Sequence, residues 1–126
     1  MRLKNFNVDY GSKVFRSFSD ISRIRIMNIL YNRKESCIAD LELILNFTQT
    51  KTSRHVNYLK NQNLLNMKYV NQFIFYSIRE EALDLIDQIF KLLEKDKQLE
   101  KDLEIYDIMN SNRELSKNKL EILKNK

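Results

Sequence analysis

Residues 48–60 carry a run of hydrogen-bonding and cationic side chains, the chemistry needed to bind a polyanion. The positions of this run that are expected to be exposed, none of them acidic, are Gln49, Thr50, Lys51, Ser53, Arg54, Asn57 and Lys60. Glutamine can pair with adenine through two hydrogen bonds, arginine can pair with guanine, and lysine neutralises phosphates. At helical spacing these residue types indicate a helix that binds in the major groove of double-stranded DNA.

A second predicted helix precedes this one at a short distance. Apolar residues recur at helical spacing from Ile38 to Leu45, Ser36 is the expected N-cap, and the helix should end near Asn46. Thr48 is a suitable N-cap for the polar helix that follows. Two helices joined by about three residues, the second with a cationic first turn, have the plan of a helix-turn-helix; an ordinary helical hairpin is the alternative.

The hydrophobic period changes from 3.6 to 2 after this pair of helices. In LNMKYVNQFIFYSI the apolar residues alternate between two faces, and Val70-Asn71-Gln72 is the expected turn. A helix-turn-helix followed by a hairpin is a winged helix. The predicted fold class is therefore mainly α with a small β-hairpin.

Further helices are predicted on both sides of this core. Residues 10–19 form a short amphipathic helix through Val14, Phe15 and Phe18, and Asp20 caps the next apolar helix. Downstream, Ser77 and Glu80 form a capping box that opens a long helix.

The long helix carries an apolar stripe that is wider than one small domain can cover. Leu83, Ile86, Phe90 and Leu93 form the stripe, which Leu85, Ile89 and Leu92 widen and which Leu99, Leu103 and Tyr106 continue. A second capping box, Ser111 with Glu114, precedes a last helix that contains Leu115, Leu120, Ile122 and Leu123.

A two-sided apolar helix in a chain of 126 residues predicts a homodimer joined through its terminal helices. The expected dimer contacts are Phe15, Leu83, Ile86, Ile89, Phe90 and Leu93. We therefore expect one domain over residues 1–126, with a winged helix-turn-helix core at 10–78 and a helical dimerisation segment at 79–126.

The charge distribution favours the first part of the chain as the polyanion-binding part. Residues 1–78 hold 12 Lys and Arg against 5 Asp and Glu, whereas residues 79–126 hold 10 against 12. No apolar run is long enough to span a membrane and no secretory signal opens the chain, so we expect a cytoplasmic protein without a membrane partner. With no proline and one glycine, asparagine is expected at the tight corners.

The composition also excludes several kinds of site. One cysteine, Cys37, and one histidine, His55, are too few soft ligands for a common zinc site, so no metal and no cofactor is expected. No nucleophile–base pair, glycine-rich phosphate loop or carboxylate dyad stands out, which argues against an enzyme.

Residues 14–79 resemble the ArsR/SmtB family of winged helix-turn-helix transcriptional regulators. VFRSFSDISRIRIMNIL is similar to the family's opening helices and FIFYSI to its second wing strand. DLELILNFTQTKTSRHVNYLKNQNLL resembles its helix-turn-helix without a gap. The residues that carry the resemblance are Phe18, Asp20, Arg23, Gln49, Ser53, Arg54, His55 and Leu59.

The resemblance implies a DNA-binding repressor that an effector releases from its operator. Gln49, Thr50, Ser53 and Arg54 are the candidates for base edges. The candidates for phosphate, sugar or supporting contacts are Thr48, Lys51, His55, Tyr58 and Lys60, with Lys68 and Gln72 on the wing. His55 has an alternative role as a packed helix residue. A symmetric dimer would bind an inverted repeat with half-sites roughly 34–36 Å apart.

The sequence departs from the family at its glycines and at its sensor positions. Asn46, Asn63 and Asn71 stand where the family usually has glycine. Many members bind metals through a Cys-x-Cys pair at the start of the third helix, where this chain has Cys37 and Ala39, and others use histidines on the last long helix. Residues 79–126 contain no histidine, so we expect no metal sensing.

Three other hypotheses stay open at this stage. Cys37 could be a redox sensor if its helix-start position lowers its pKa, although a lone cysteine more often serves as a small hydrophobic residue. The effector could be a small organic molecule held between the long helices. The winged helix could also serve as a protein-interaction module without DNA binding.

Overall fold

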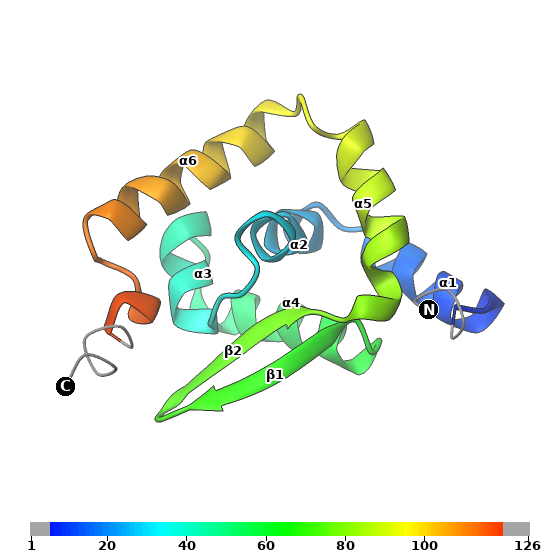
Figure 1. The fold of residues 1–126 in the computed structure, drawn as a ribbon, viewed down its shortest axis with the longest axis horizontal. Helices are drawn as coiled ribbons and strands as arrows, with labels where there is room; N and C mark the ends of the chain where they lie inside the picture. Colours follow the sequence, from blue (N-terminus) through cyan, green and yellow to red (C-terminus); the bar gives the residue numbers. More distant parts are fainter. Residues whose placement is uncertain (1–5, 120–126) are drawn as a thin grey trace.

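Helix α2 (Ile21–Arg33) occupies the centre of the fold, and the other elements surround it (Figure 1). The computed structural model of the protein describes residues 6–119. Around α2 lie α1 (Val8–Ser17), α3 (Ile38–Leu45), α4 (Gln49–Asn61), β1 (Leu65–Val70), β2 (Phe73–Ile78), the 3-10 helix η2 (Glu80–Ala82), α5 (Leu83–Leu92) and α6 (Lys97–Ser111). Helix α6 arches over α2, α3 and α5 flank it, and the hairpin lies below with α4 behind it.

The hydrophobic core gathers on α2 because that helix is covered on most of its sides. Five consecutive residues, from Ile26 to Leu30, are buried. Fully buried side chains from every neighbouring layer join them, among them Val14, Leu41, Leu59, Ile86 and Leu115. A helix buried to this extent also buries polar groups, and these need partners from the elements that cover it.

Of the three N-caps predicted before the hairpin, two are confirmed and one is wrong. Asp20 accepts a hydrogen bond from the Arg23 amide at 3.1 Å, and Thr48 accepts one from the Lys51 amide at 3.1 Å. Ser36 does not cap α3, because its backbone is paired with Tyr76 of β2 through two hydrogen bonds of 3.1 and 2.8 Å. The N-cap is Cys37, which makes no side-chain capping bond.

The asparagines predicted at tight corners do adopt left-handed backbone conformation. Asn46, which ends α3, has φ 56°, Asn63 after α4 has φ 60°, and Asn71 at the hairpin turn has φ 55°. Lys34 and Arg113 also have positive φ, at 78° and 58°. Asparagine tolerates this region better than other residues with a Cβ, so it replaces glycine at these three corners.

The predicted hairpin is confirmed, with a shorter turn than expected. Strands β1 and β2 pair antiparallel from Leu65 opposite Ile78 to Val70 opposite Phe73. The turn is therefore Asn71-Gln72, and Val70 belongs to β1. A two-residue turn with positive φ at its first position suits the twist of paired strands. The hairpin and the helix-turn-helix α3–α4 together confirm the predicted winged-helix fold.

The single long helix predicted from Ser77 onward is wrong. Ser77 lies in β2 opposite Asn66, so strand pairing removes it from the expected capping box. The chain instead forms η2 and then α5, which has no side-chain cap. It turns at residues 93–96, and Asp96 caps α6 by accepting a hydrogen bond from the Leu99 amide at 3.0 Å.

The second predicted capping box is also wrong, because Ser111 is the last residue of α6. The chain becomes helical again at residue 116, and Asn118 accepts a hydrogen bond from the Leu115 amide at 3.1 Å. Leu115 is fully buried. The predicted apolar residues Leu120, Ile122 and Leu123 lie outside the described residues.

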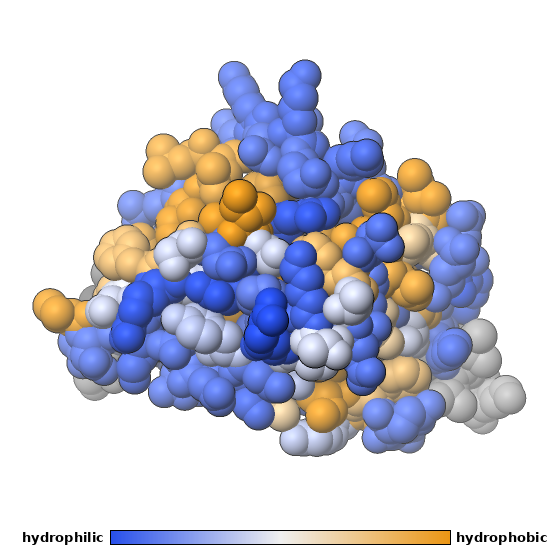
Figure 2. All heavy atoms as spheres, turned by 180° about the vertical axis from the view of Figure 1, so that it is seen from behind, coloured by the Kyte–Doolittle hydropathy of each residue, from blue (hydrophilic) through white to orange (hydrophobic). Residues whose placement is uncertain are grey.

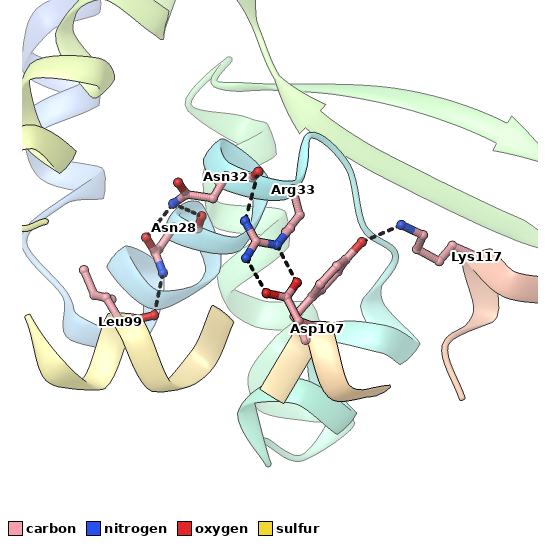
Figure 3. Close-up of polar contacts among 7 residues, drawn as sticks. Asn28, Asn32, Arg33, Leu99, Asp107 and Lys117 are labelled. Carbon is pink, nitrogen blue, oxygen red and sulfur yellow. Dashed lines mark hydrogen bonds and ion pairs between the residues drawn. The ribbon is translucent and has the colours of Figure 1, made fainter. Parts of the chain in front are cut away.

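Helix α6 is fastened to α2 by polar contacts along its length (Figure 3). Asn28 donates a hydrogen bond to the carbonyl of Leu99 at 3.2 Å, and Arg33 makes two hydrogen bonds to Asp107, at 2.9 and 2.8 Å. A third contact joins Arg25 to the buried carboxylate of Asp102. The inner face of α6 is therefore part of the subunit's own packing.

The segment after α6 is fastened to α3 by a buried carboxylate. Asp40 is 1% exposed and accepts hydrogen bonds from the amides of Ser116 and Lys117, at 2.6 and 3.3 Å. An ionised carboxylate bound by two backbone N–H groups is stabilised in the interior. The two contacts hold the end of the described chain against the start of α3.

Replacing Asn46 tests the left-handed corner between α3 and α4. Asn46→Ala should lower the free energy of unfolding by about 1 kcal/mol, because alanine is strained at positive φ. Asn46→Gly should leave it within a few tenths of a kcal/mol of the parent. Urea denaturation of the two variants measures the difference, and an alanine variant as stable as the glycine variant would contradict the assignment.

Candidate nucleic-acid interface

The first turns of α4 face solvent and carry most of the predicted DNA contacts. Gln49, Thr50 and Arg54 are exposed, and Lys51 and Ser53 are half-buried. Helix α4 lies behind the hairpin in Figure 1, so the reverse view in Figure 2 faces it. A band of hydrophilic side chains crosses this face, as a surface that binds a polyanion requires (Figure 2).

The turn between α3 and α4 holds the start of α4 in place. Thr48 uses its hydroxyl to cap α4, so its side chain has a structural role. Phe47, half-buried beside it, lies under two cations: the Lys51 Nζ is 4.1 Å from the ring centroid and the Arg25 guanidinium is 5.1 Å from it. The aromatic ring thereby contacts both α2 and the first turn of α4.

His55 does not belong to the contact surface, which corrects its predicted role. The residue is 6% exposed, so DNA cannot reach most of its ring. Burial lowers its pKa below the ordinary 6.5, opposed by the charge of Asp20 and assisted by that of Arg54. The imidazole is therefore mostly neutral at pH 7, which agrees with the alternative of a packed helix residue.

The two later positions on α4 are less open than the first turn. Tyr58 is half-buried, and the Arg23 guanidinium lies 4.1 Å from the centre of its ring. Arg23 also donates hydrogen bonds to the carbonyls of Ser17 and Arg16, each at 3.0 Å, and so ties α1 to α2. Lys60, in the last turn of α4, is half-buried as well.

The wing offers one neutralised cation and an exposed tip. Lys68 is exposed but forms an ion pair with Glu35 at 3.0 Å, which offsets its charge. Gln72 is exposed in the turn. Tyr69 is 69% exposed on β1 and was not among the predicted contacts. Strand alternation does not predict this exposure, because Tyr69 shares a face of β1 with Leu65 and Met67, which pack into the core.

Cys37 lies at the start of α3 and is buried, with 3% of its surface exposed. Burial, together with the charge of the neighbouring Asp40 carboxylate, raises the pKa of its thiol from 9.0 to about 11. The thiol is therefore protonated at neutral pH, which does not suit the proposed redox trigger. Among residues 6–119 no group of three or more Cys, His, Asp or Glu side chains is placed to hold a metal ion.

The predicted dimer contacts divide into core and surface residues. Ile86 and Phe90 are buried inside the subunit, and Phe90 stacks on Tyr31 with ring centroids 5.2 Å apart, so these two residues are not available to a partner. Leu83, Ile89 and Leu93 are half-buried, and Phe15 is 63% exposed. Other apolar side chains exposed on or next to α1 and α5 are Val8, Ile21 and Leu92.

Comparisons with known proteins identify the family. The family model described as "Bacterial regulatory protein, arsR family" matches residues 20–67, from the cap of α2 into β1. The arsenical resistance operon repressor of Bacillus subtilis is 30% identical over 70 residues, which cover 56% of this chain and 67% of that repressor. The chain belongs to the ArsR family. Members of this family are regulators of transcription and are not enzymes.

A further relative agrees in sequence, and a solved structure agrees in fold. The cadmium resistance transcriptional regulatory protein CadC of Listeria innocua is 28% identical over 87 residues, 68% of this chain and 73% of CadC. The solution structure of Mb0332 from Mycobacterium bovis, described as a homodimeric winged helix-turn-helix DNA-binding domain, superposes with a TM-score of 0.62 at 16% identity. It covers 71% of this chain and 83% of that domain.

None of the helices within residues 6–119 is both long and apolar enough to cross a membrane.

The raised pKa of Cys37 gives a direct chemical prediction for this ArsR-family protein. At pH 7 the native thiol should react with iodoacetamide about a hundredfold more slowly than in the urea-unfolded chain, because two pKa units remove that much thiolate, and burial slows the reaction further. The rate should rise with pH up to about 11 in the folded protein. Labelling at neutral pH as fast as in the unfolded chain would restore the redox hypothesis.

Proposed function

We propose that this ArsR-family regulator binds an inverted-repeat operator in double-stranded DNA as a homodimer and represses transcription until a small-molecule effector releases it. The observation that carries the proposal is the outward first half of α4, where hydrogen-bonding and cationic side chains face solvent and no acidic residue is present. Repression at a chromosomal operator also implies a protein of the cytoplasm.

The exposed positions of α4 divide by chemistry. Gln49 and Arg54 supply the fork-shaped groups that recognise adenine and guanine, and Thr50 and Ser53 add single hydrogen bonds. Lys51 and Lys60 are assigned to phosphates, with Tyr58 at the edge of the contact and Gln72 at the wing. Lys68 contributes less, because Glu35 already pairs with it.

A dimer through α1 and α5 accounts for apolar surface that a single subunit leaves exposed. Phe15 and Leu92 are 63% and 86% exposed, and Figure 2 shows a hydrophobic patch above the hydrophilic band on the α5 side. Burying side chains of this size is worth roughly 1.5–3 kcal/mol each. The Mb0332 domain, which has a similar fold, is described as homodimeric, and this supports the proposal that the present chain also forms a dimer. A two-fold axis would then place two α4 helices in successive major grooves.

The effector is proposed to be a small molecule and not a metal bound at the start of α3. Two relatives have names that refer to cadmium and arsenical resistance. In this chain Cys37 and Ala39 stand at the two positions of the family's Cys-x-Cys pair, so the second cysteine is missing. A single protonated thiol is a poor metal ligand. The ligand set those names imply is therefore not expected in this regulator.

Removing the Arg54 side chain tests the DNA contact. Arg54→Ala should weaken binding to the specific operator by about 1–3 kcal/mol, because it deletes a bidentate base contact. The control Lys101→Ala removes the same charge from an exposed position on α6 and should change affinity far less. Fluorescence anisotropy with a labelled fragment of the chain's own upstream DNA measures both.

The salt dependence of the same titration separates DNA binding from a protein-interaction role. For DNA binding, log affinity should fall linearly with log salt, with a slope of about −0.9 for each phosphate neutralised. An Arg54→Ala variant with the parent's operator affinity would remove the base-contact assignment. A parent protein without any salt-dependent affinity for duplex DNA would favour the protein-interaction module.

A charge placed on α1 tests the proposed dimer. Phe15→Glu should shift the protein from dimer to monomer in sedimentation equilibrium, because a carboxylate would be buried in an apolar interface. Ile108→Glu, at an apolar residue of α6 that is 59% exposed, is the matched control and should leave the dimer intact. A Phe15→Glu protein that remains dimeric would place the interface elsewhere.

A further inference from the structure

Helix α6 is connected through a continuous series of side chains to α4, the recognition helix of the proposed function. Asp102, in the middle of α6, is completely buried and accepts two hydrogen bonds from Arg25 of α2, at 2.9 and 3.0 Å, and one from Gln98 at 2.9 Å. Two parallel hydrogen bonds fix the plane of a guanidinium as well as its position. Arg25 is thereby held in one orientation by a residue 77 positions away in the sequence.

The guanidinium held in this way lies against the turn of the helix-turn-helix. It is 5.1 Å from the ring centre of Phe47, the only apolar residue of the turn formed by residues 46–48. The same ring lies 4.1 Å from the Nζ of Lys51, in the first turn of α4. Cations over an aromatic face are attracted by its quadrupole, so the ring is coupled to both charges.

We propose that Arg25 and Asp102 are positioning residues for DNA binding: the docking of α6 on α2 orients Phe47 and, through it, the Lys51 ammonium and the start of the recognition helix. This inference rests on the proposed function and extends it. A helix with no place in the DNA interface then sets the affinity of the interface, so a change that breaks the Arg25–Asp102 contact weakens DNA binding.

A second ion pair between the same two helices provides a matched control. Arg33 and Asp107 also form a bidentate pair between α2 and α6, at 2.9 and 2.8 Å (Figure 3). Arg33 lies over Tyr106 of α6, at 5.7 Å from its centroid, and no contact joins it to the turn at Phe47 among those described for residues 6–119. Asp102→Asn and Asp107→Asn change the net charge equally, and only the first should affect α4.

The test compares Asp102→Asn, Phe47→Leu, the double variant and Asp107→Asn by DNA anisotropy titration at several salt concentrations. Asp102→Asn and Phe47→Leu should each weaken binding about fivefold and reduce the salt slope by nearly one phosphate. The double variant should be little weaker than either single variant, because both changes break the same series of contacts. Asp107→Asn should bind at least as tightly as the parent, since it gains the same positive charge and Arg33 has no described contact with the turn at Phe47.

Several results would overturn the proposal. A folded Asp102→Asn protein with the parent's affinity and slope would refute it, as would an Asp107→Asn protein that loses as much as Asp102→Asn. If Asp102→Asn does not fold, Phe47→Leu provides the test. A Phe47→Leu protein with the parent's affinity would also refute the proposal.

Amide hydrogen exchange separates this proposal from the proposed function. Without DNA, Asp102→Asn should speed the exchange of residues 46–52 relative to Asp107→Asn. A parent protein that does not bind DNA would refute the proposed function, while faster exchange in that segment would still support the coupling. Unchanged exchange in that segment would refute the coupling itself.

Discussion

The burial of α2 on most of its surface is the constraint on which the rest of the structure depends. Apolar side chains of the surrounding helices and the hairpin cover Ile26, Met27, Ile29 and Leu30, and this packing is the main source of favourable free energy. The same helix carries Arg25, Asn28 and Arg33, which would be poorly solvated under a purely apolar cover. Helix α6 supplies the oxygen atoms that these groups require.

The packing of the inward side chains around α2 explains why the molecule has two dissimilar outer faces. The cationic and amide groups of α4 remain outside because the buried side of that helix, Thr52, Val56 and Leu59, completes the core. On α1 and α5 the inward residues Val14, Ile86 and Phe90 are buried against α2. The apolar side chains on the other sides of these two helices therefore remain exposed. One face is thus chemically suited to a nucleic acid and the other to a second subunit.

Local signals in the sequence were sufficient to predict the winged helix. These signals depend only on residues a few positions apart, so they can be recognised without a structure. They are the caps Asp20 and Thr48, the alternation in the hairpin, and asparagine at residues 46, 63 and 71. The predictions that failed involve competition at a distance. Ser36 and Ser77 are good capping residues, but Ser36 pairs with Tyr76 of β2, and Ser77 pairs with Asn66 of β1 inside the hairpin.

The end of the chain was the hardest part to predict. No glycine or proline marks the break at residues 93–96, so one apolar stripe appeared continuous over two helices. The partners of Arg25 and Asp40 lie 77 and 76 residues away, and spacing alone cannot pair them. For the same reason, burial of His55 and of Ile86 was visible only once α4 and α5 had been placed against α2.

These long-range pairs have a consequence for biosynthesis. A ribosome makes the winged helix before the residues that pair with its charged groups, so a nascent chain that ends before Asp102 carries Arg25, Arg33 and Asp40 without their partners. Final packing must therefore wait for residues 102–117 to emerge. Translation that stops before α6 would yield a chain that contains all of α4. In that chain the charged groups of Arg25, Arg33 and Asp40 would be exposed to water.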